Sequence, residues 1–88
     1  MSLKITFMGT PEFAKKILES IHNSKHEIQA VYTKPSSKKD RGQKVISSHV
    51  FQFAKKNNIL VRSPLKFDND EYDFLKNLKS DVIVVVAF

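Results

Sequence analysis

The sequence contains no cysteine, and this absence excludes disulfides, a thiol nucleophile and every cysteine-based zinc or iron–sulfur centre. Glycine and proline are scarce, at two and three of 88 residues, which excludes collagen-like and low-complexity classes. No window approaches the roughly 18 apolar residues that a membrane span needs. The short apolar run near Met1 does not resemble a signal peptide. We therefore expect a cytoplasmic protein with no membrane partner.

Positive charge is concentrated in one segment of the chain. Fifteen Lys and Arg residues against nine Asp and Glu residues give a net charge of +6. Residues 34–44 hold five of the basic side chains against Asp40 alone. Such a compact excess suits an electrostatic contact with phosphates, and the alternative interpretation is a solvated loop.

Short apolar runs alternate with amphipathic segments along the chain. Apolar residues spaced at i, i+4 and i+8 predict helices, of which the first two are capped by Thr10 and Ser47. The third follows the acidic cluster 68–71, and we expect its Tyr72 to point inward. Residues 34–44 are predicted to form a loop. The predicted strands cover residues 3–8, 28–33, 59–61 and 82–88.

Strands separated by helices predict right-handed crossovers and a parallel sheet with helices on both faces. The expected fold class is therefore α/β, a Rossmann-like doubly wound sheet with about four strands and three helices. The expected strand order is 3-2-1-4.

The last predicted strand, residues 82–88, shows no polar alternation, so we expect it to be buried on both faces. Burial of its Val and Ile side chains would contribute roughly 8 to 15 kcal/mol, comparable with the net stability of a whole domain. We therefore expect residues 1–88 to be the N-terminal part of a longer catalytic domain, truncated within or just after the fourth strand.

Several well-known motifs are missing or incomplete. Gly9 begins a strand-to-helix turn, but neither the G-x-G-x-x-G pattern nor a P-loop follows it. His22 and His26 lie four residues apart without a third ligand, so we expect no metal site. Ser47 and Ser48 beside His49 do not make a catalytic triad, because sequence neighbours do not adopt that geometry.

Five segments resemble the methionyl-tRNA formyltransferases in the same order along the chain. Residues 7–14, FMGTPEFA, resemble the F-x-G-T-P-[ED]-F-A that follows the first strand of that family. The other four segments are residues 30–33 with Pro35, residues 41–45, residues 58–61 and residues 79–88. The chain departs from the family at residues 34–38, where relatives read Q-P-D-R-P, and at His49, where they have proline.

The resemblance implies transfer of a formyl group from 10-formyltetrahydrofolate to the amino group of methionyl initiator tRNA. It makes Arg41 the principal tRNA contact and Lys44 a phosphate contact. Lys38 and Lys39 have no clear counterpart in the family and are assigned to tRNA on charge alone.

The resemblance also assigns residues to the methionyl group and to the folate donor. Phe13 would line the methionyl pocket, with an ordinary core position as the alternative, and Gly9 and Thr10 would form the adjacent turn. The folate donor would run along the end of the last strand. The residues available to it are Val86, Ala87 and Phe88, which suit a core equally well.

No catalytic residue is assigned in this chain, because the family's catalytic Asn, His and Asp belong to later segments. We expect the remainder of the same polypeptide to supply them and the chain alone to be inactive. One alternative is another folate-dependent formyltransferase, acting on a purine precursor or an amino sugar, which the basic residues 41–44 disfavour. A second alternative is a non-catalytic RNA-binding module, which the lack of aromatic residues within 34–44 disfavours.

Overall fold

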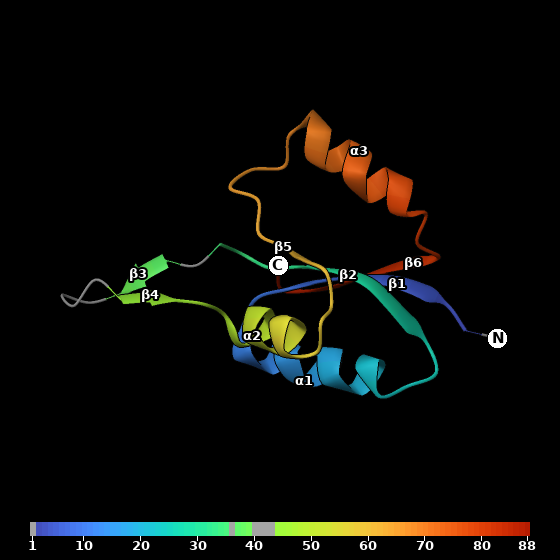
Figure 1. The fold of residues 1–88 in the computed structure, drawn as a ribbon, viewed down its shortest axis with the longest axis horizontal. Helices are drawn as coiled ribbons and strands as arrows, with labels where there is room; N and C mark the ends of the chain where they lie inside the picture. Colours follow the sequence, from blue (N-terminus) through green and yellow to red (C-terminus); the bar gives the residue numbers. More distant parts are fainter. Residues whose placement is uncertain (1, 36, 40–43) are drawn as a thin grey trace.

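A parallel sheet of four strands forms the centre of the computed structural model, which describes residues 2–35, 37–39 and 44–88. In spatial order the strands are β5, β2, β1 and β6 (Figure 1). This is the order 3-2-1-4 expected for the parallel strands, and the α/β fold class is confirmed. The bounds are β1 Lys4–Gly9, β2 Glu27–Tyr32, β5 Val61–Arg62 and β6 Val82–Val86.

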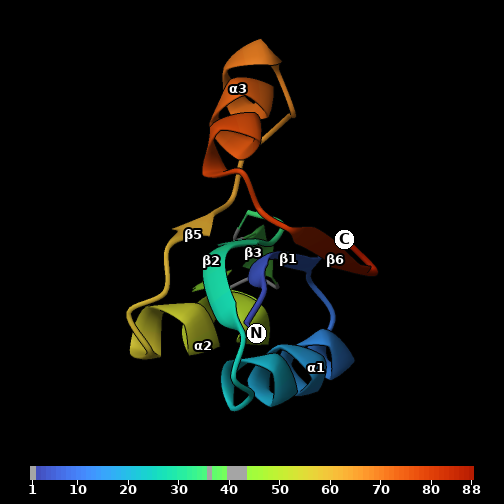
Figure 2. The ribbon, with the colours of Figure 1, turned by 90° about the vertical axis from the view of Figure 1, so that its right-hand side faces the viewer.

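Helices cover both faces of this sheet (Figures 1 and 2). Helices α1 (Glu12–His22) and α2 (His49–Lys56) lie on one face, and α3 (Asn69–Leu78) lies on the other. The apolar core fills the α1/α2 side, because the periodic stripes of both helices face the sheet there. Its buried members are Phe7, Ala14, Leu18, Val31, Val50 and Ala54.

The helix starts differ from the two capping predictions. Pro11 occupies the N-cap of α1 without a side-chain cap bond, so the prediction for Thr10 is wrong. Ser48, rather than Ser47, caps α2, and its hydroxyl accepts a hydrogen bond from the Phe51 amide. The capping residue must be extended and immediately precede the first turn, and a one-residue shift of the helix changes which side chain meets that condition.

Residues 34–44 were expected to be a loop, but part of this segment is regular. Strands β3 (Ser37–Lys39) and β4 (Lys44–Ile46) pair antiparallel. In their register, Lys39 lies opposite Lys44. The resulting hairpin projects from the body of the molecule beyond the end of β2 (Figure 1).

Strand β6 is a sheet edge within this chain, and the expectation that it is buried on both faces is wrong here. It pairs with β1 alone among the described strands. Ile83 and Val85 are 47% and 61% exposed, whereas Val84 and Val86 pack against the core. Tyr72 on α3 is also largely exposed, contrary to prediction, because α3 stands off the sheet on this side (Figure 2).

Within the described ranges, none of the helices has the length and apolar character needed to cross a bilayer.

Candidate ligand-binding edge of the sheet

The carboxyl ends of the parallel strands define the candidate site. In open α/β sheets the ligand crevice lies beyond these ends. Here the edge is formed by Gly9, Tyr32, Arg62 and Val86, the last residues of β1, β2, β5 and β6. The hairpin β3–β4 extends from the same edge (Figure 1). Among the described residues, Gly9 and Val86, two of the predicted contact positions, therefore lie at this end of the sheet.

Gly9 allows three elements to approach one another at this edge. A Cβ atom at Gly9 would lie 2.8 Å from the Val86 carbonyl oxygen and 2.9 Å from the Ala14 Cβ atom. Both distances are shorter than side chains tolerate, so a larger residue would push β6 and α1 away from β1. Gly9 thus shapes the turn before α1 from a buried position.

Three hydroxyl groups connect the base of the hairpin to the sheet. The Thr10 hydroxyl oxygen accepts hydrogen bonds from the Lys34 amide, at 3.1 Å, and from the Thr33 hydroxyl, at 3.4 Å. The Thr33 and Ser48 hydroxyls are 2.9 Å apart. Thr33 leads into β3, whereas Ser48 follows β4, so this chain of hydroxyls holds both stems of the hairpin. The roles of Thr33 and Ser48 were not predicted from the sequence.

Phe13 is displayed on the surface of the first turn of α1. It is 55% exposed, so the alternative of an ordinary core position is wrong for this chain. Together with Glu12 and Lys16 it borders a shallow depression. Exposure leaves Phe13 accessible to a ligand, and the methionyl role stays a prediction.

Three of the four predicted tRNA residues fall on the hairpin strands. The backbone places Lys38 and Lys39 on β3 and Lys44 on β4. Arg41 lies outside the described residues. Lys34, which precedes the hairpin, is exposed. The fold thus brings Lys38, Lys39 and Lys44 onto one projecting ribbon.

The predicted folate residues end β6 and turn away from it. Ala87 adopts a left-handed backbone conformation with φ of 52°, which residues other than glycine rarely adopt. Phe88 then borders an apolar pocket of about 280 Å³ between α3 and the sheet. Met8, Phe67, Tyr72 and Leu75 complete the lining of this pocket.

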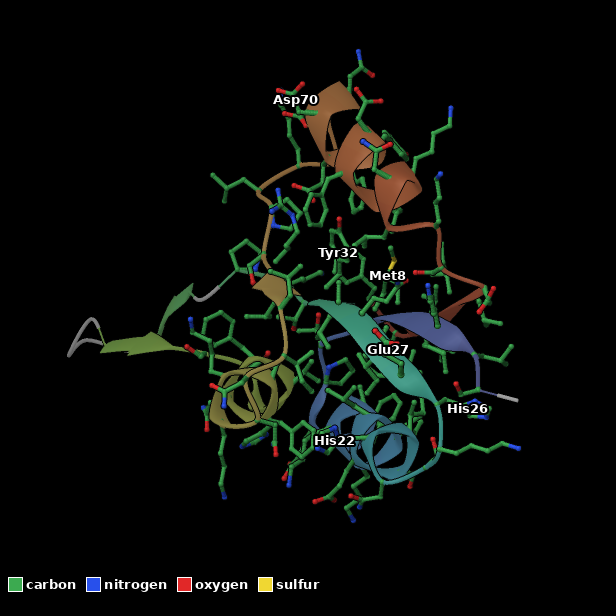
Figure 3. All side chains as sticks on the ribbon, turned by 45° about the vertical axis from the view of Figure 1, so that its right-hand side comes forward. Met8, His22, His26, Glu27, Tyr32 and Asp70 are labelled. Carbon is green, nitrogen blue, oxygen red and sulfur yellow. The ribbon has the colours of Figure 1, made fainter. Side chains whose placement is uncertain are left out.

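A hydrogen-bonded network around the buried Glu71 links α3 to β2 and β5. The Tyr32 hydroxyl donates to Glu71 Oε2 at 2.6 Å, and Arg62 Nη2 donates to Glu71 Oε1 at 3.0 Å. Hydrogen bonding from Arg62 is the largest cause that lowers the pKa of Glu71, while burial opposes it. Burial and the bond to Glu71 raise the pKa of Tyr32. Figure 3 shows Tyr32 pointing from the sheet toward α3.

Aromatic contacts reinforce this network. The Arg62 guanidinium lies over the Phe74 ring, 3.9 Å from its centroid. The ring of Tyr32 stacks on Phe67 with centroids 5.3 Å apart. The network was not predicted, because Tyr32 and Glu71 are 39 residues apart and no local pattern links them. In the part of the chain that the structure describes, no three His, Asp or Glu side chains gather as metal ligands would.

The four-stranded parallel sheet with helices on both faces is a Rossmann-like α/β fold. The chain belongs to the formyl transferase family, whose model matches residues 3–88.

Individual relatives agree with this assignment. The chain is 46% identical to a methionyl-tRNA formyltransferase of Pelagibacter ubique, covering 100% of the chain and 29% of the relative. It is 46% identical to one of Carboxydothermus hydrogenoformans, over 98% of the chain and 28% of the relative. A Francisella philomiragia methionyl-tRNA formyltransferase is 43% identical over the same shares. The chain thus spans less than a third of the length of these relatives.

Proposed function

We propose that this chain is the N-terminal part of the catalytic domain of a cytoplasmic methionyl-tRNA formyltransferase. The observation that carries the proposal is whole-chain similarity to proteins of that name, at 43–46% identity. The reaction moves the formyl group of 10-formyltetrahydrofolate to the amino group of methionine on initiator tRNA. No residue of this chain is given a catalytic role.

The hairpin is the tRNA-binding part of this proposal. We assign Arg41 and Lys44 as the main contacts, and Lys38 and Lys39 on β3 add positive charge. Support comes from the projection of β3 and β4 from the carboxyl edge and from the hydroxyl chain that holds their stems. Lysine side chains attract RNA phosphates without reading sequence, so this ribbon would orient the acceptor end.

In this proposal the turn after β1 contacts the methionyl group, and the end of β6 contacts the folate donor. Exposed Phe13 contacts the methionyl side chain, with Gly9 and Thr10 forming the turn beside it. Val86, Ala87 and Phe88 contact the folate donor. The apolar pocket beside Phe88 fits an aromatic ring system, because Phe67 and Tyr72 also line it. The donor itself supplies the formyl group.

The open edge of β6 supports a further element of the proposal, that the remainder of a longer polypeptide covers it. An apolar edge strand presents unpaired backbone N–H and C=O groups that another strand can bind, and natural proteins usually cover such edges. Exposed Ile83 and Val85 on β6 are the side chains that such a segment would bury.

The proposal is tested by tRNA binding to this chain. With labelled initiator tRNA and fluorescence anisotropy, we expect Arg41→Ala/Lys44→Ala to weaken binding about tenfold at low salt. Lys25→Ala/Lys55→Ala removes the same charge from sites away from the hairpin and should change binding less than twofold.

Two outcomes would contradict this proposal. Equal affinity of wild type and the Arg41→Ala/Lys44→Ala variant would favour a formyltransferase for a small acceptor. Formyl transfer to charged tRNA by residues 1–88 alone would show that the catalytic groups lie within this chain.

A further inference from the structure

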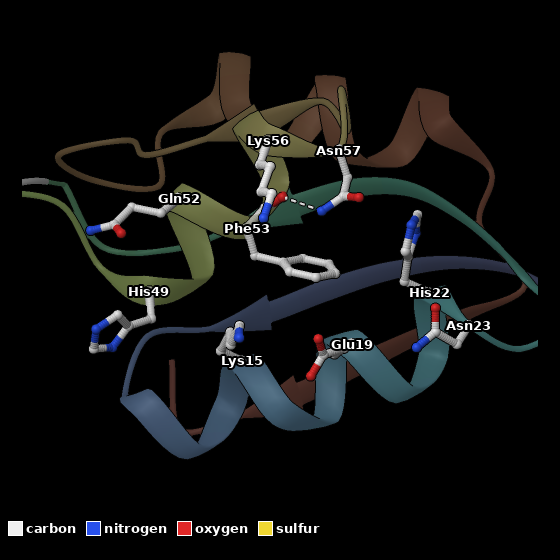
Figure 4. Close-up of a pocket in the computed structure, with 9 residues that line it drawn as sticks. All are labelled: Lys15, Glu19, His22, Asn23, His49, Gln52, Phe53, Lys56 and Asn57. Atoms are coloured by element: carbon white, nitrogen blue, oxygen red, sulfur yellow. Dashed lines mark hydrogen bonds between the residues drawn. The ribbon is translucent and has the colours of Figure 1, made fainter.

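A groove of about 450 Å³ lies between α1 and α2, on the side of the sheet opposite α3 (Figure 4). One wall comes from α1 and its C-cap Asn23, and the other comes from α2 and its C-cap Asn57. The lining residues are Lys15, Glu19, His22, Asn23, His49, Gln52, Phe53, Lys56 and Asn57. Neither the sequence motifs nor the proposed formyl-transfer site involves this groove.

Two lysines of the groove lack an ion-pair partner among the described residues, and one of them lies against an aromatic ring. The Lys15 ammonium lies 5.9 Å from the centroid of the Phe53 ring, which the His22 ring meets edge-on. Lys56 contributes a second ammonium from α2. Among the described residues, no carboxylate lies within ion-pair distance of Lys15 or Lys56, and Glu19 is the single acid in the lining.

The neutral amides of the groove are partly committed to the backbone. Asn57 Nδ2 donates to the Phe53 carbonyl oxygen at 2.9 Å, and Gln52 Nε2 donates to the Ser47 carbonyl oxygen at 3.1 Å. Lys15 and Lys56 are the two lysine ammonium groups in the lining. Two lysines in a lining that is polar apart from Phe53 suit an anionic chain better than an apolar protein segment.

The groove begins where the hairpin ends. His49, at one end of the groove in Figure 4, is the first residue of α2 and is separated from β4 only by Ser47 and Ser48. From there the lining runs along α2 to Asn57 and along α1 to His22. An RNA strand that contacts the hairpin can thus continue into the groove without leaving the protein surface.

We infer that the α1–α2 groove binds a phosphodiester segment of the RNA that the hairpin contacts. Lys15 and Lys56 are the phosphate contacts, and Phe53 positions Lys15 through its ring. The recognition is of charge and backbone rather than of base sequence, because lysine offers a mobile point charge. This inference rests on the proposed tRNA-binding function and adds a second contact surface to it.

The first test removes the two cations. In the anisotropy assay with labelled initiator tRNA, we expect Lys15→Ala/Lys56→Ala to weaken binding about fivefold and to reduce the slope of log affinity against log salt by roughly 1.4 to 1.8. Lys25→Ala/Lys55→Ala is the matched control, because Lys55 neighbours Lys56 on α2 but does not line the groove. The control should change the affinity by less than twofold.

The second test removes the acid. Glu19→Gln deletes a negative charge from the groove with little change in shape, so we expect tRNA to bind about twofold to threefold more tightly at low salt. A purely structural role for these residues does not predict tighter binding. Thermal unfolding followed by circular dichroism would show whether the variants remain folded.

The outcomes separate this inference from the proposed function. If Arg41→Ala/Lys44→Ala weakens binding while Lys15→Ala/Lys56→Ala and Glu19→Gln leave it unchanged, the groove inference is wrong and the proposed function stands. Equal weakening by the control pair would also overturn the inference. If the hairpin variant binds as wild type does, the proposed function itself fails.

Discussion

The two faces of the sheet are held by different forces. On the α1/α2 face, apolar side chains from both helices close over β1 and β2, and Phe7, Leu18 and Val31 are fully buried. On the α3 face, the contacts described are mainly hydrogen bonds and stacked rings around Glu71. One face is therefore closed by this chain's own apolar residues, whereas on the other face polar contacts hold α3 and apolar side chains such as Tyr72 and Ile83 stay exposed.

Polar contacts extend along the α3 face away from Glu71. Gln29 Nε2 donates to the Leu78 carbonyl oxygen at 2.9 Å, and the Ser80 hydroxyl donates to Gln29 Oε1 at 2.5 Å. Each hydrogen bond contributes only about 1 kcal/mol net, much less than a large buried apolar side chain. We therefore expect α3 to open more readily than α1 or α2.

The largest expected effect is on the apolar face. Leu18→Ala removes a fully buried side chain, and we expect it to lower the free energy of unfolding by about 2 to 5 kcal/mol. Leu65→Ala is the control, because Leu65 is 93% exposed and should cost less than about 0.5 kcal/mol. Urea unfolding followed by circular dichroism measures both. Similar losses for the two variants would contradict the assignment of the core to this face.

A smaller effect is expected from the charged network on the other face. Glu71→Gln keeps the shape of the side chain but removes the charge that Arg62 and Tyr32 bind. We expect a loss of about 1 to 2 kcal/mol, because the Arg62 side chain is partly exposed and its ion pair is screened. Asp73→Asn on the exposed side of α3 should be neutral. Hydrogen exchange should locate the Glu71→Gln loss in α3 rather than in α1.

The smallest effect is the pH dependence of the same network. The folded-state pKa of Glu71 lies below its ordinary value of 4.5. Its contribution is therefore fully present above that value and is lost as pH falls through the lower folded pKa. We expect the free energy of unfolding to fall less steeply below pH 4.5 in Glu71→Gln than in wild type. Identical acid profiles for both proteins would contradict a stabilising ionised Glu71.

The parts of the fold that were predictable follow from local patterns. Apolar spacing located α1 and α2, and the alternation of strands and helices predicted the order of the parallel strands. The cap of α2 was displaced by one residue, because Ser47 and Ser48 are both chemically competent and only the backbone conformation distinguishes them. The hairpin within residues 34–46 was missed, since its lysines resemble those of a solvated loop.

Features that depend on distant partners were not predictable from one sequence. The bond between Tyr32 and Glu71 joins a strand to a helix 39 residues later. The exposure of β6 was missed for a different reason. Its run of valines and isoleucines predicts burial, but no described element of this chain pairs with its outer edge. For the candidate site, the resemblance named Gly9 and Val86, which lie at the carboxyl edge, whereas the hydroxyl chain through Thr33 required coordinates.

The most direct test of the central claim, that RNA contacts the hairpin and the α1/α2 side of the molecule, is hydrogen exchange of this chain with and without initiator tRNA. We expect tRNA to slow exchange of amides in β3, β4 and the first turn of α2 and to leave α3 unchanged. Slower exchange confined to α3 and β6, with the hairpin unaffected, would contradict the account.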